Sequence, residues 1–410
     1  MSDRRKYLTI FLLAVSCLCY SLPYLSSSFY TQFLEAFQLT NTQAGLLLSM
    51  FSLTATPGYL FGGLLADKFS PKKLVALSSF LTAALGVVLI FMNSFTAMMI
   101  CYLGFGLTTT FINWSAVMKL IRAQADSNSE GKVFGFFELS YAIIGAVTSY
   151  GILAVLQSVI ASVGFKGVIG IYAGILVVVG ILIQLLVKDV ESDASADDFD
   201  FRMVKKALSH PVTWINGFIV MGMFILVTGV TYLSPYMISV FGFSAAVGSG
   251  YAIFHRTLAR MFFSPLGGIL LDRWKTPKLL ITVSAAMIAV LVALILLPQK
   301  PAMGTAALVL MVLLVVLLAS GRSGMYTPIP EAGIPYEITG TAMGITSAIG
   351  YSTDLWLYTV CGRWIDVHGN DGYRYILMLF IAGLVMVIIS AYMLYRYKKH
   401  HSGEICNETA

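Results

Sequence analysis

Four basic side chains lie in stretches of the sequence that are otherwise apolar: His255, Arg256, Arg260 and Arg322. A charge in such a stretch costs about 2.5–3.5 kcal/mol on membrane-insertion scales, and its retention indicates a functional site. A guanidinium group donates two parallel hydrogen bonds to a carboxylate, phosphate or sulfonate. These residue types therefore predict a site for a small organic anion.

Two carboxylates, Glu138 and Asp354, lie in further apolar stretches. If both are ionised and each pairs with one of the three arginines, the remaining arginine keeps no fixed protein partner. An anionic substrate is the simplest partner for it. A carboxylate whose arginine partner moves between two states binds a proton in one of them only. We therefore expect Glu138, Asp354 and His255 to couple protons. The alternatives are a static ion pair of Arg260 with either acid, and a histidine that is satisfied structurally.

The elements that position these charges are predicted to be transmembrane helices. The chain is 58% hydrophobic and 11% charged, whereas soluble domains carry about 25% charged residues. A helix of roughly 20 apolar residues crosses a hydrocarbon core. The predicted spans lie near 7–30, 42–66, 72–94, 96–122, 132–160, 167–187, 211–236, 246–271, 277–298, 303–329, 340–364 and 373–397.

The eighth span sets the depth of its arginines. Arg260 lies twelve residues before Asp272, or about 18 Å along a helix, which is near the membrane midplane. Arg256 lies one turn further out, on the same helical face, while His255 points elsewhere. We expect Arg260 to contact substrate first, followed by Arg322. Arg256 lies near the outer boundary and has the alternative of snorkelling.

Polar and aromatic residues in other spans are predicted to complete the cavity. These candidates are Tyr24, Asn113, Trp114, Tyr232 and Trp356. Each has the alternative of packing or of lying in an interfacial belt. Tyr24-Leu-Ser and Tyr232-Leu-Ser are favoured because the same tripeptide recurs in both halves of the chain.

A charged hairpin is repeated half a chain apart. Gly63-Leu-Leu-Ala-Asp67-Lys68 closes one apolar segment, and Gly268-Ile-Leu-Leu-Asp272-Arg273 closes another. This duplication predicts an all-α polytopic membrane protein with 12 transmembrane helices as two pseudo-symmetric six-helix bundles. The predicted domains are residues 1–187, a cytoplasmic linker 188–210, residues 211–397 and a tail 398–410. Most Lys and Arg residues fall on one side, so both termini are expected in the cytoplasm.

The hairpin resembles the signature of the major facilitator superfamily, Gly-x-Leu-Ala-Asp-Arg-x-Gly-Arg-Lys. The chain matches at Gly63, Leu65, Ala66, Asp67 and Lys72, and departs at Lys68, Ser70 and Pro71. The resemblance implies that each hairpin aspartate meets the positive end of a helix in the other half and latches one state. The alternative is that the charges only set topology. The implied gating residues are Gly63, Asp67, Lys68, Lys72, Gly268, Asp272 and Arg273.

Further segments resemble a bacterial branch near the organic-anion and sugar-phosphate carriers: 113–119, 131–138, 331–335 and 339–344. Two other superfamily motifs are missing. Ile100 stands where an arginine often precedes Gly104, and the fifth span lacks the Gly-Pro of antiporters. Both differences disfavour a proton-driven drug exporter.

The sequence therefore predicts a secondary active transporter that moves a small organic anion by alternating access, with proton symport. The alternatives are an exporter of amphipathic compounds, an anion exchanger and a membrane sensor that binds a solute without moving it. The expected partners are the anionic substrate, protons and the lipid bilayer of a bacterial inner membrane. We expect a monomer, no nucleic acid, no cofactor, no metal and no catalytic residue.

Overall fold

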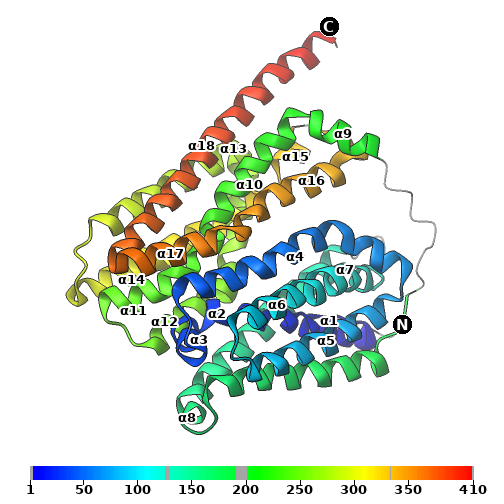
Figure 1. Ribbon diagram of the computed structural model, residues 1–410. Helices are drawn as coiled ribbons and strands as arrows, with labels where there is room; N and C mark the ends of the chain where they lie inside the picture. The colour runs from blue at the N-terminus through cyan, green and yellow to red at the C-terminus, as the bar shows by residue number, and fades with distance from the viewer. Residues whose placement is uncertain (1–2, 125–129, 191–200, 333, 409–410) are drawn as a thin grey trace. The chain divides into compact units, whose positions relative to one another are not determined.

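The computed structural model of the protein describes residues 3–124, 130–190, 201–332 and 334–408. Within these ranges the chain is helical and has no strand (Figure 1). It divides into two compact units. The first comprises Met1–Ala196, Ala245–Leu258 and Tyr358–Gly362, and the second comprises Asp197–Ser244, Ala259–Leu357 and Arg363–Ala410. Residues 191–200 of the predicted linker lie outside the described residues.

The first unit is built from the N-terminal spans and two short segments of the second half. Its first span is interrupted: α1 leads through the 3₁₀ turn η1 into the short helices α2 and α3. Its helices are α1 (Asp3–Ser16), η1 (Cys17–Ser21), α2 (Leu25–Ser28), α3 (Tyr30–Phe37), α4 (Asn41–Lys68), α5 (Pro71–Phe91), α6 (Phe95–Gly106), α7 (Ser115–Arg122), α8 (Glu130–Leu186) and α12 (Ala245–Ile253). Helix α8 contains two spans, because Gly164 breaks it with a φ of 67°.

The second unit holds the remaining spans and an amphipathic helix, α9, that lies within the predicted linker 188–210. Its helices are α9 (Phe201–Ser209), α10 (Pro211–Gly229), α11 (Leu233–Phe241), α13 (Ala259–Leu296), α14 (Gly304–Gly321), α15 (Pro328–Glu331), α16 (Tyr336–Tyr351) and α18 (Gly372–Glu408). Helix α17 (Leu357–His368) contributes its first turn to the first unit and its end to the second.

The number of spans agrees with the hydropathy of the sequence. Eight helical stretches among the described residues are long and apolar enough to cross a membrane, or nine with the bent pair Asn41–Tyr59 and Phe61–Lys68. Two of them, Ala245–Leu296 and Ile338–His400, have 52 and 63 residues, whereas one crossing needs about 20. Each is broken at a residue of positive φ, Lys275 or Gly369, and so contains two spans. With the N-terminal segment these make the 12 predicted spans.

The repeated hairpin has a similar turn in each unit. Ser70 caps α5, where its Oγ accepts a hydrogen bond from the Lys73 amide at 3.2 Å, and Pro71 follows in the first turn. Thr276 and Pro277 occupy the corresponding positions in the second unit. The two turns differ before this point, because Lys275 adopts a φ of 61°, a region that side chains other than glycine seldom enter.

Close helix packing in both units depends on the glycine that precedes the motif glycine. A Cβ on Gly62 would lie 2.8 Å from the Phe111 carbonyl oxygen, and one on Gly267 would lie 2.0 Å from the Ser320 carbonyl oxygen. A Cβ on Gly63 or Gly268 would meet no described atom within 4 Å. The close approach of helices is therefore made at Gly62 in the first unit and at Gly267 in the second, and not at the motif glycines.

A polar network joins three segments at one end of the second unit. The Glu331 carboxylate accepts hydrogen bonds from the Thr276 amide at 3.2 Å and from Lys398 Nζ at 2.8 Å. Burial alone would raise the pKa of Glu331, but the hydrogen bonds from Lys398 and Thr276 outweigh it and hold the pKa below its usual value. The network therefore ties the turn before α13's second span to α15 and to the end of α18.

We predict that Gly267→Ala lowers the thermal stability of the purified protein, because the added Cβ forces α13 away from the α14 backbone. Overpacking of this kind typically costs about 1–3 kcal/mol. Differential scanning fluorimetry in detergent measures the effect, and Gly268→Ala is the matched control that leaves the melting temperature unchanged. Equal melting temperatures for the two variants would contradict the packing assignment.

We predict that Glu331→Gln destabilises the protein at neutral pH and that the difference from the native chain shrinks in acid. A carboxyl whose folded pKa is lowered stabilises the fold above its unfolded pKa of about 4.3. That contribution is lost as the pH falls through the folded pKa. Melting temperatures at pH 7 and pH 4 test this. Asp371→Asn is the control, because Asp371 is 69% exposed and meets Arg374 at 3.7 Å. A difference that persists unchanged at pH 4 would refute the prediction.

Candidate substrate site

Most of the predicted site residues lie where a spanning helix departs from α geometry. Tyr24 follows the 3₁₀ turn η1, and Trp356 follows the 3₁₀ turn η7 (Ser352–Leu355), which contains Asp354. The other departures are the π turn η2 (Leu107–Trp114), the 3₁₀ turn η3 (Val230–Tyr232), the π turn η4 (Phe254–Leu258) and the 3₁₀ turn η6 (Arg322–Gly324). These four contain Asn113 and Trp114, Tyr232, His255 and Arg256, and Arg322, respectively.

Such departures have a physical meaning within a membrane. Irregular backbone at membrane depth leaves amides and carbonyls that lipid cannot satisfy, so it occurs where protein or a water-filled cavity surrounds it. Discontinuous helices of this kind form the substrate sites of many transporters, and π turns are frequent at functional sites. The position of the breaks therefore favours the residues they contain as parts of a solute site.

In the first unit, Tyr24 and Arg256 are brought together from opposite halves of the sequence. The Arg256 guanidinium lies over the Tyr24 ring, with Cζ 4.5 Å from its centroid. The Phe51 ring meets the same tyrosine edge-on at 5.3 Å. Phe51 and Arg256 are 205 residues apart, which is the spacing of the repeated hairpins. Two equivalent positions of the duplicated halves therefore converge on one ring.

Further polar groups lie near this pair. Tyr172 in α8 is within electrostatic range of Arg256, and its hydroxyl is 3.5 Å from Ser149 Oγ. Glu138, also in α8, is exposed and lies within electrostatic range of Cys17 in η1. The predicted bridge between Glu138 and Arg256 or Arg260 stays a prediction.

The π turn η4 alters one expectation about the eighth span. Residues four apart share a face in an α-helix, and this rule placed Arg256 and Arg260 on one face. The wider π turn ends between them, at Leu258, and the two side chains differ in exposure. Arg256 is half-buried, whereas Arg260, the preferred substrate contact of the sequence interpretation, is exposed at the start of α13.

The fourth span holds Asn113 and Trp114 in different surroundings. Asn113 is fully buried, and its Nδ2 donates to Cys19 Sγ at 3.4 Å. Trp114 is half-buried, with its ring 6.2 Å from the rings of both Tyr20 and Tyr59. Asn113 therefore packs inside the helix bundle, and Trp114 belongs to an aromatic group beside it. Their contact with substrate stays a prediction.

A second polar group lies in the second unit around Asp354. The Thr228 hydroxyl donates to the Asp354 carboxylate at 2.5 Å. Nearby in sequence, Tyr351 packs edge-on against Phe224 at 4.5 Å and lies 3.5 Å from the Tyr326 hydroxyl. A carboxylate beside a hydroxyl group is suited to exchange a proton. Thr228 could not be found from the sequence, because its partner lies 126 residues away.

The remaining candidates occupy separate positions. Tyr232 is buried, with 1% exposure, while Arg322 and Trp356 are half-buried. His255 is half-buried, and its ring lies 6.1 Å from that of Tyr251 in the same span. The structure gathers Arg256 with Tyr24 in one unit, and it places Asp354, Tyr232, Arg322 and Trp356 in the other.

The hairpin aspartate of the first unit has a partner that the sequence interpretation missed. Lys119 Nζ, at the end of the fourth span, lies 2.8 Å from Asp67 Oδ1 and 3.2 Å from the Ala66 carbonyl oxygen. Lys68, Asp272 and Arg273 are exposed, and Lys72 is half-buried. The gating function of all these residues, Gly63 and Gly268 included, stays a prediction.

The helices and the repeated hairpin together define a polytopic membrane protein with two related halves. Residues 8–353 match the sequence pattern of the Major Facilitator Superfamily. The chain belongs to this superfamily, and it is therefore a membrane transporter. The predicted fold of two six-helix bundles is confirmed.

Three known proteins illustrate the relationship. Inner membrane protein YihN of Escherichia coli K12 is 29% identical over 371 residues, which cover 87% of each chain. Inner membrane protein YqcE of the same organism is 27% identical over 409 residues, covering 96% of this chain and 95% of the other. A bacterial homologue of the human lysosomal transporter Spinster, solved inward-facing and unoccupied, has a TM-score of 0.73 at 15% identity. It covers 97% of this chain and 98% of its own.

We predict that Asp67 and Lys119 are energetically coupled. In a double-mutant cycle of Asp67→Asn and Lys119→Met, the effects on thermal stability should be non-additive by about 0.5–1 kcal/mol, because each single change already removes the ion pair. Lys68→Met is the control, since it should add independently to Asp67→Asn. Additivity of Asp67→Asn with Lys119→Met would show that the contact contributes nothing.

Proposed function

We propose that the protein is a secondary active transporter for a small organic anion, such as a carboxylate, a phosphate ester or a sulfonate, and that it couples the anion to protons. The two inner membrane relatives support a location in the bacterial inner membrane. The distribution of Lys and Arg supports cytoplasmic termini. Alternating access follows from the duplicated halves of the chain.

One observation carries the anion assignment: the Arg256 guanidinium lies over the Tyr24 ring, with Cζ 4.5 Å from its centroid. The cation–π attraction holds the group at the ring, and its N–H donors lie along the edges of the planar guanidinium. The donors along its edges then match the two oxygens of a carboxylate or phosphate. The surrounding π turn places this group at an irregular point of the eighth span, where solute sites are common. Arg256 therefore replaces Arg260 as the first candidate for substrate contact.

Asp354 carries the proposal for proton coupling, with Glu138 as the second carboxylate. The Asp354 carboxylate is engaged by Thr228, and its span is broken at that point. A carboxylate that gains or loses such a partner as the helix moves changes its affinity for a proton. Proton uptake in one state and release in the other would drive accumulation of the anion.

We predict that Arg256→Ala reduces anion uptake about 10- to 100-fold, which corresponds to the ~1.5–3 kcal/mol of a hydrogen bond to a charged group. The assay uses purified protein in liposomes and a panel of carboxylates, phosphate esters and sulfonates. Arg256→Lys keeps the charge but loses the planar donors, so its uptake should be intermediate. Arg374→Ala is the control, because Arg374 is exposed and pairs weakly with Asp371.

An imposed proton gradient provides the second arm of this experiment. Asp354→Asn and Glu138→Gln should abolish gradient-driven accumulation while leaving exchange of internal for external anion. Uptake that is unchanged in Arg256→Ala overturns the binding assignment. Flux that occurs only as exchange in the native protein supports the anion exchanger, transport of neutral or cationic amphiphiles supports the exporter, and binding without flux supports the sensor.

A further inference from the structure

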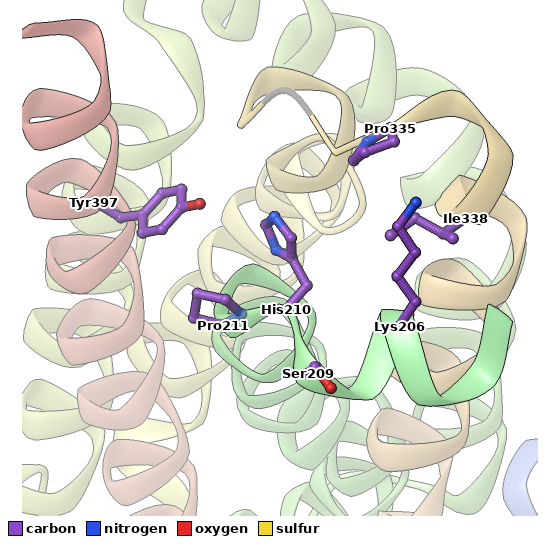
Figure 2. A pocket seen from close by; sticks show the side chains of 7 residues that line it. All are labelled: Lys206, Ser209, His210, Pro211, Pro335, Ile338 and Tyr397. Carbon is purple, nitrogen blue, oxygen red and sulfur yellow. The ribbon is translucent and has the colours of Figure 1, made fainter. Parts of the chain in front are cut away.

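A hollow of about 420 Å³ lies in the second unit, outside the group of residues assigned to substrate. It is lined by the end of α9, the beginning of α10, the beginning of α16 and the end of α18. Figure 2 shows the imidazole of His210 between the ring of Tyr397 and the side chain of Lys206. The rings of His210 and Tyr397 lie 6.1 Å apart. Its volume is within the usual range of ligand pockets, roughly 300–1,000 Å³.

The polar groups of this hollow are suited to donate hydrogen bonds. Lys206 carries a charged ammonium with three N–H donors, so it can retain a protein partner and still bind an anion. Ser209 and Tyr397 add hydroxyl groups. His210 Nδ1 accepts from the Val212 amide at 3.4 Å, which places the proton of the neutral ring on Nε2, a donor. Among the described lining residues none is acidic, so the donor set fits a phosphate group.

The helix that carries Lys206 has the features of a segment at the membrane surface. Ala207 is fully buried against the unit, whereas Arg202, Lys205 and Lys206 are exposed. Apolar side chains are exposed beside these cations: Met203 is 38%, Leu208 39% and Trp214 44% exposed. A basic amphipathic helix with exposed apolar residues lies at the headgroup level and attracts anionic lipid.

Trp214 fixes the position of α9 relative to the adjoining span. Its indole Nε1 donates to the Leu208 carbonyl oxygen at 2.8 Å, so α9 is held against the first turns of α10. Tryptophan is enriched at the boundary between hydrocarbon and headgroups. Trp214 therefore indicates that the junction of α9 and α10, which lines the hollow, lies at this boundary, where a lipid phosphate is available.

The geometry points to a binding site for the headgroup of an anionic phospholipid, with the phosphate held by Lys206, His210 and the hydroxyls of Ser209 and Tyr397. The exposed apolar residues of α9 and α10 then lie against the acyl chains. The lipid would hold α9, which connects the two halves of the chain, at the membrane surface. This site is separate from the proposed transport function and does not depend on it.

The test is a thermal-unfolding titration of the purified full-length protein in detergent with dioctanoyl phosphatidylglycerol. The lipid should raise the melting temperature of the native protein, while dioctanoyl phosphatidylcholine and inorganic phosphate at equal concentration should not. Lys206→Met should weaken the apparent affinity about five-fold. Lys205→Met is the matched control: it removes the same charge from the same helix, but Lys205 does not line the hollow. Tyr397→Phe should weaken binding without any change in net charge.

Three results would overturn this inference. Equal weakening by Lys205→Met and Lys206→Met would show diffuse attraction rather than a site. An equal shift with inorganic phosphate would show a site for a soluble anion. An equal shift with phosphatidylcholine would show that the phospholipid's net negative charge is not recognised.

Discussion

Hydrocarbon offers no hydrogen bonds to a polypeptide backbone, and the arrangement of this protein follows from that constraint. A spanning helix satisfies its own amides and carbonyls, so each departure from α geometry needs a local reason. In the described chain the departures in six spans coincide with arginine, histidine, aspartate and aromatic residues, from Tyr24 to Asp354. The same turns that disturb the backbone also redirect those side chains. The breaks in the helices and the polar or aromatic side chains of these spans therefore occur at the same positions.

The two halves share their packing positions, but they differ at one position that lies against Tyr24. The glycine contacts at Gly62 and Gly267 and the turns at Ser70 and Thr276 recur at nearly the same spacing. Phe51 and Arg256 also correspond, but one is apolar and the other is charged. Both pack on Tyr24. A position that is structural in one half has thus acquired a donor group in the other, while the surrounding helix packing is preserved.

Hydropathy predicted the spans, because burial in lipid dominates the energy of such a chain. The repeated hairpin motif indicated the duplication and carried the resemblance to the superfamily. Finer features followed from tertiary packing and had no local signal. No residue between Phe254 and Leu258 announces a π turn, so the sequence predicted a regular α-helix through the eighth span. The motif drew attention to Gly63, although its neighbour Gly62 makes the contact. Partners such as Lys119 for Asp67 and Thr228 for Asp354 lie 52 and 126 residues away and need the fold to be found.

The π turn in the eighth span also affects how this protein can be compared with its relatives. A π turn accommodates more residues per turn than an α turn, so every residue after Leu258 is rotated about the helix axis relative to a regular span. In a relative with an unbroken eighth helix, the residue aligned with Arg260 occupies a different angular position around the bundle. Conservation at an alignment column beyond this point does not imply a shared orientation. Two aligned residues beyond Leu258 can therefore face different sides of the eighth span in two related proteins.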